Sequence, residues 1–66
     1  DDERTRSREE LQRADALINA FRAQVRTDLR THVAKGGTLP ASVVSDLDAA
    51  LDAATHEITR ALSAAS

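Results

Sequence analysis

The chain has 66 residues, no cysteine, and a single aromatic side chain, Phe21. A chain of this length makes one small domain, whose core rarely supplies more than ~3–5 kcal/mol of stability. The missing cysteines exclude a disulfide scaffold and thiolate metal sites, so we expect oligomerisation to supply the missing stability. The formal net charge of −2 argues against a general binder of polyanions.

The sequence also bears on where the protein works. It has no apolar run near the ~20 residues of a membrane span, and it has no signal-peptide pattern. Arginine outnumbers lysine eight to one, and alanine occurs thirteen times. We therefore expect a cytoplasmic bacterial protein without membrane contact. The first residue is not methionine, which is compatible with an excised domain or a processed product.

The first predicted helix covers about residues 7–35. Residues 1–10 hold no apolar side chain, so burial cannot order them, and we expect fraying there. Ser7 with Glu10 fits a capping box, and Thr5 is an alternative cap, which predicts a helix start within residues 5–8. The apolar stripe that follows is spaced by three and four residues, and Leu17, Ala20 and Ala23 widen it. Its positions are Leu11, Ala14, Ile18, Phe21, Val25, Leu29 and Val33.

Residues 36–40, Gly-Gly-Thr-Leu-Pro, predict a break between two helices. Glycine favours the left-handed conformation just past a helix end, and proline is tolerated where the next helix begins. A connection this short makes its two helices neighbours. We therefore expect an antiparallel helical hairpin.

The second predicted helix covers about residues 41–64, with Thr38 and Ser42 both available as caps. Its apolar positions alternate spacings of three and four throughout, as in a coiled-coil heptad. Val43, Ala50 and Leu62 widen this seam beyond what one partner helix covers. The seam consists of Val44, Leu47, Leu51, Ala54, Ile58, Ala61 and Ala65.

Two stripes this wide cannot both be buried in a lone hairpin. Burying one large apolar side chain contributes about 1.5–3 kcal/mol, so pairing two hairpins recovers substantial stability. The predicted fold is therefore all-α, an antiparallel two-helix hairpin that dimerises into a four-helix bundle. The expected oligomer interface consists of Leu17, Ile18, Phe21, Val25, Leu47, Leu51, Ile58 and Leu62.

Three arginines, Arg22, Arg26 and Arg30, form a ridge along the first helix. In a hairpin centred on Thr38, positions at the same height have numbers that sum to about 76. The ridge then faces the acidic side chains of the second helix, and we expect the interhelical pairs Arg30–Asp46, Arg26–Asp48 and Arg22–Asp52.

The alternative is a small nucleic-acid-binding regulator in which this ridge contacts phosphates. In architecture the chain resembles the plasmid-encoded RNA-binding hairpin dimers of the Rop type. That resemblance is one of shape, carried by no residue motif, and it implies nucleic-acid binding only by analogy. With the ridge paired to aspartates, we do not expect nucleic acid as a partner.

Two further pairs, Asp28 with His32 and Asp52 with His56, have the same spacing of four residues, which places both side chains of a pair on one face of a helix. Together they contain carboxylate and imidazole ligands, but the hairpin keeps them far apart. We expect no metal and no cofactor, and we read the pairs as helix-surface hydrogen bonding, with Asp28 and His32 fixing register at the hairpin end.

No nucleophile or phosphate-loop pattern is present, so we expect no enzyme. The predicted function is a non-enzymatic oligomerisation or protein-docking module, a homodimer that could also bind another protein.

Overall fold

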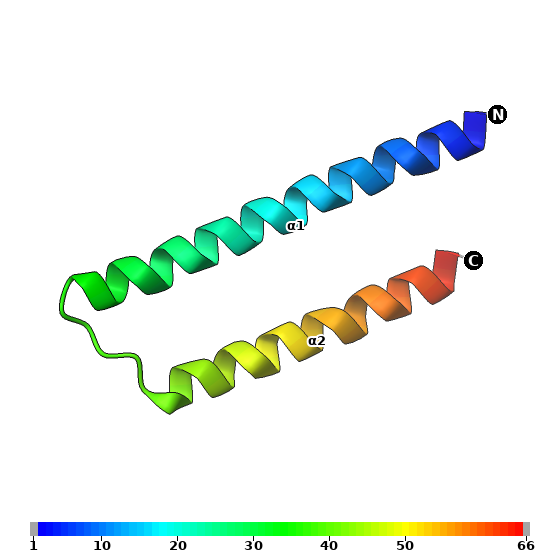
Figure 1. The fold of residues 1–66 in the computed structure, drawn as a ribbon. Coiled ribbons are helices and arrows are strands. Elements are labelled where there is room, and N and C mark those ends of the chain that lie inside the picture. Colours follow the sequence, from blue (N-terminus) through cyan, green and yellow to red (C-terminus); the bar gives the residue numbers. More distant parts are fainter. Residues whose placement is uncertain (1, 66) are drawn as a thin grey trace.

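The computed structural model describes residues 2–65, and these form two helices joined by a short turn. Asp1 and Ser66, the two ends of the expected domain, lie outside the described residues. The helices run in opposite directions beside one another, so that the two ends of the chain lie at the same end of the molecule (Figure 1). The prediction of an all-α, hairpin-like fold is confirmed.

Helix α1, Asp2–Ala34, begins earlier than the sequence predicts. Thr5 and Ser7 lie inside it, so neither is an N-cap. Glutamate and arginine, which make up much of the first turns, have high helix propensity. Asp2 and Glu3 also complement the positive end of the helix dipole.

The end of α1 has the geometry of a Schellman motif. The Gly36 amide donates to the Val33 carbonyl at 3.0 Å, and the Gly37 amide donates to the His32 carbonyl at 2.9 Å. Gly36 has φ 89°, which glycine adopts without the steric cost of a side chain. These two bonds satisfy carbonyls that the helix end leaves free, and they turn the chain sharply.

A histidine side chain closes this turn. His32 Nε2 lies 2.7 Å from the Thr38 carbonyl oxygen and donates a hydrogen bond to it. Asp28 accepts instead from Gln24 Nε2 at 2.9 Å. Asp28 and His32 therefore do not pair with each other, but His32 acts at the end of the hairpin as expected, through the backbone of the turn.

Helix α2 runs from Ala41 to Ala65. The Pro40 carbonyl accepts the Val43 amide at 3.0 Å, so Pro40 itself occupies the cap position. Within the described chain, neither the Thr38 nor the Ser42 hydroxyl makes a hydrogen bond, and neither of the two expected caps is used.

The two helices face one another without close packing. In the described part of the chain, no Cα atom of α1 lies within 8 Å of a Cα atom of α2. None of residues 2–65 is buried, and the Cα atoms span 54 × 20 × 7 Å. A 7 Å dimension is about one layer of helices, so this chain has no core of its own.

Candidate interaction surface

The two helices meet across an apolar groove of about 240 Å³. Phe21, Val25 and Leu29 line it from α1, and Leu47 and Leu51 line it from α2. Val25, Leu29 and Leu47 are half-buried, while the rest of the two stripes is exposed. The groove therefore marks the only region of residues 2–65 where apolar side chains of the two helices shelter one another.

Two further hollows continue this groove along the same side of the hairpin. One shares Leu47 and Leu51 with it and adds Val44. The other shares Leu29 and adds Val33 and Leu39 at the turn. We call the joined surface the apolar trough. It consists of Phe21, Val25, Leu29, Val33, Leu39, Val44, Leu47 and Leu51.

The trough contains half of the side chains expected at an oligomer interface. Four of them, Phe21, Val25, Leu47 and Leu51, line the central groove together. The other four lie nearer the open end of the hairpin and do not line the trough. They are Leu17, Ile18, Ile58 and Leu62, all exposed.

Sequence reasoning missed Leu39 as an interface candidate. Its side chain is 42% exposed and extends the trough over the turn. It lies outside both helices, so no helical period includes it. The signal that could have found it is a large apolar residue between a glycine pair and a proline, where a turn otherwise favours polar residues.

The trough has charged edges of opposite sign. Arg22, Arg26 and Arg30 line it on the α1 side, and Asp48 lines it on the α2 side. Arg22 donates only to Asn19 Oδ1 of its own helix, at 3.4 Å. The side chains of Arg26 and Arg30 make no hydrogen bond or ion pair with any of residues 2–65.

The expected ladder of interhelical ion pairs is therefore wrong for the single chain. The ion pairs Glu10–Arg13, Asp52–His56 and Glu57–Arg60 each join neighbours on one helix. An exposed pair contributes only ~0–1 kcal/mol, which does not draw two unpacked helices together. The expected pair Arg30–Asp46 is excluded by geometry as well. Asp46 is two residues from Asp48 and therefore projects from the opposite side of α2.

The side-chain contacts of His56 and Arg60 stay within α2. His56 Nδ1 lies 2.9 Å from the Asp52 carbonyl oxygen and 3.6 Å from Asp52 Oδ2, so this pair forms the helix-surface contact expected of it. Arg60 donates to Glu57 Oε1 and, at 3.3 Å, to Oε2. The hydrogen bond to Glu57 raises the pKa of the Arg60 guanidinium, a group that is charged at physiological pH in any case.

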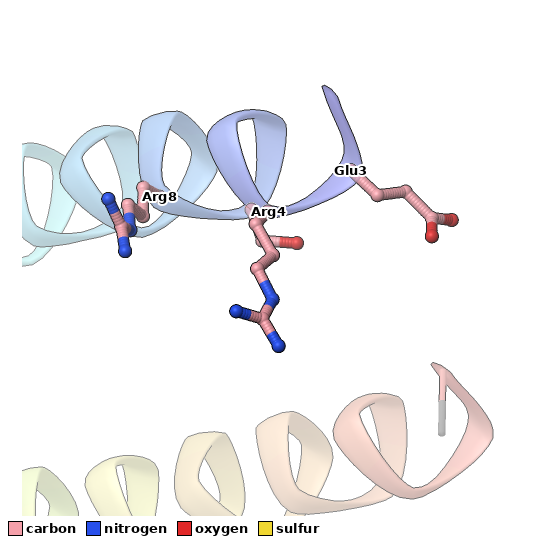
Figure 2. A pocket seen from close by; sticks show the side chains of 4 residues that line it. Glu3, Arg4 and Arg8 are labelled. Atoms are coloured by element: carbon pink, nitrogen blue, oxygen red, sulfur yellow. The ribbon is translucent and has the colours of Figure 1, made fainter. Parts of the chain in front are cut away.

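A polar hollow lies at the start of α1, bounded by Glu3, Arg4, Ser7 and Arg8. Figure 2 shows Arg4 extending toward the side occupied by α2, while Glu3 extends sideways past the start of α1. The lining contains no apolar side chain, and the hollow opens widely to solvent. This region matches the solvated segment that the sequence predicts, although it is helical.

The described residues contain no group of three or more histidine, cysteine, aspartate or glutamate side chains that could hold a metal ion. Within the same range, neither helix is long and apolar enough to cross a membrane.

The apolar trough with its two charged edges is thus the surface most suited to a partner. Compared with protein-family models, curated proteins and solved structures, the chain shows no significant match.

Proposed function

We propose that the chain is a non-enzymatic oligomerisation or protein-docking module, whose basic form is a homodimer that closes into a four-helix bundle. The apolar surface of the hairpin carries this proposal. Eleven large apolar side chains are exposed, among them Phe21 at 55% and Ile58 at 57%. Soluble chains seldom leave so much apolar surface in water unless a partner covers it.

The total surface area supports the same conclusion. The chain exposes 6013 Å² for a mass of 7.1 kDa. A compact monomer of this mass would expose about 4,100 Å², which leaves an excess of roughly 1,900 Å². A standard interface buries about 800 Å² per partner, and obligate homodimers bury more. The excess is therefore of the size that an obligate dimer covers.

The arrangement of the apolar residues favours association over collapse of one chain. In a lone hairpin each helix covers one flank of the other helix. The apolar stripes of both helices are wider than one flank, so part of each stripe stays exposed. A second hairpin supplies two more helices and encloses the residues between four neighbours. The heptad spacing of α2 suits such coiled-coil-like packing.

The experiment is a measurement of mass in solution by sedimentation equilibrium, with helicity followed by circular dichroism over the same concentrations. We expect a mass of two chains at micromolar concentration and a loss of helicity on dilution. A stable, highly helical monomer at those concentrations would contradict the proposal.

A second candidate function rests on the unpaired arginines. Arg22, Arg26 and Arg30 were expected to be neutralised by aspartates, and without those pairs they remain available to phosphates. Binding of a generic RNA or DNA would then weaken steeply with salt and disappear in Arg22→Gln/Arg26→Gln. Absence of binding at low salt removes this candidate.

A further inference from the structure

The apolar trough is self-complementary in charge. Its α1 edge carries Arg22, Arg26 and Arg30. Its α2 edge carries Asp48, and Asp52 follows one turn later on the same side of that helix. A two-fold interface must be self-complementary, because each patch meets its own copy, and a patch with halves of opposite charge meets this condition.

The way in which two hairpins stack decides which edges meet. If the two-fold axis runs parallel to the helices, each α1 lies on the partner's α2, and the basic edge meets an acidic one. If the axis runs across the helices, α1 lies on the partner's α1, and arginines meet arginines. Like charges that face each other across an interface are unfavourable, so the electrostatics select the parallel axis.

The heights of the charged residues agree with this choice. Phe21 to Leu29 face Leu47 and Leu51 across the groove, which places residues whose numbers sum to about 76 at one height. Rotation about an axis parallel to the helices moves no residue along them. Arg26 of one chain therefore stands level with Asp48 of the other, and Arg22 stands level with Asp52.

We propose that two copies associate through the apolar trough about a two-fold axis parallel to the helices, with the arginine edge of each α1 against the Asp48–Asp52 edge of the partner's α2. The proposal rests on the proposed homodimer and adds its face, its orientation and its charge pairs. The apolar floor favours a second copy of the chain over a polyanion as the occupant, since a phosphate backbone gains nothing from contact with Phe21, Leu47 and Leu51. Both turns then lie at one end of the bundle.

Charge exchange between chains tests the pairs. We compare two double variants, Arg22→Glu/Arg26→Glu and Asp48→Lys/Asp52→Lys. Each of them places like charges across the interface of its own homodimer. We expect each variant alone to dimerise at least ~10-fold more weakly than wild type, and an equimolar mixture to form a heterodimer of near wild-type affinity. If the pairs formed within one chain, mixing would restore nothing.

A matched control separates specific pairing from attraction by net charge. Arg6→Glu/Arg13→Glu has the same net charge as Arg22→Glu/Arg26→Glu, but its changes lie on the opposite side of α1. We expect this control to dimerise alone and to gain no preference for Asp48→Lys/Asp52→Lys. Equal heterodimer formation by the control would overturn the charge pairs.

Orientation is tested separately, using the absence of native cysteine. Spin labels on Thr38→Cys should lie roughly 20 Å apart or closer across the dimer, about two interhelical spacings. Opposed turns would instead place them near the two ends of a molecule 54 Å long. A wild-type dimer with distant labels overturns this inference and leaves the proposed function intact.

The wild-type mass is measured first, so that failure of the dimer itself is recognised. A wild-type monomer contradicts both the proposed function and this inference. A monomer that binds a DNA or RNA oligonucleotide through Arg22 and Arg26 would assign the basic edge to nucleic acid instead.

Discussion

His32 and Thr38 are joined across the hairpin turn by a hydrogen bond of 2.7 Å between the imidazole Nε2 and the threonine carbonyl. The ring lies where a side chain on residue 37 would be, because a Cβ on Gly37 would come within 2.6 Å of His32 Cε1 and Nε2. The imidazole and the bare glycine therefore depend on each other, and together they set how the chain leaves α1.

Gly37→Ala should disrupt this turn. The added methyl group would also come within 2.6 Å of the His32 carbonyl oxygen, which is backbone and cannot move independently. We expect a loss of about 1–3 kcal/mol in the free energy of unfolding, measured by urea denaturation at fixed protein concentration. Gly36→Asn is the comparison, because a Cβ at residue 36 meets no atom and asparagine tolerates positive φ better than most side chains, so that only the backbone strain of φ 89° is added there. An equal loss in both variants would contradict the role of the His32 ring.

Replacing His32 tests the hydrogen bond itself. His32→Ala should reduce the free energy of unfolding by about 0.5–1 kcal/mol, the low end for a hydrogen bond because the residue is exposed. Asp28→Ala should change it less, since Asp28 contacts Gln24 and not His32. A larger loss of unfolding free energy in Asp28→Ala than in His32→Ala would contradict the His32–Thr38 contact and would favour a pair between Asp28 and His32.

Leu51 lies at the centre of the trough, 44% exposed in the single chain. Leu51→Asp should abolish both association and helicity, because a carboxylate would be forced into the dimer core. Ala53→Asp adds the same charge on the other side of α2 and should remain a helical dimer. Sedimentation and circular dichroism of the two variants provide the comparison. A dimeric Leu51→Asp protein would remove the trough from the interface.

The start of α1 should be dispensable for association. Proline inside a helix clashes with the preceding turn, so Arg8→Pro should unwind the residues before it. None of these residues lines the trough, and we expect lower helicity with an unchanged dimer mass. Ala23→Pro, in the middle of α1 and beside the groove, should abolish both the helicity and the dimer. If Arg8→Pro also dissociated the dimer, the charged first turns would belong to the interface.

The sequence by itself determined the helices and the place of the turn between them. Helical periodicity, the glycine pair at 36–37 and Pro40 all act locally, through a few neighbouring residues, so they can be read without a fold. The start of α1 differs from the predicted one, within residues 5–8, because the cap residues Thr5 and Ser7 were weighed above the helix propensity of the glutamates and arginines around them.

Only the tertiary structure decided what each side chain contacts. It directed His32 to Thr38, brought Leu39 into the trough, and left Arg26 and Arg30 without the aspartates that their spacing predicts. The reason is that helical period specifies which residues share a face, but not how far apart two faces stand. In this hairpin the helices stand too far apart for a core, and that separation leaves the apolar trough open between its two charged edges.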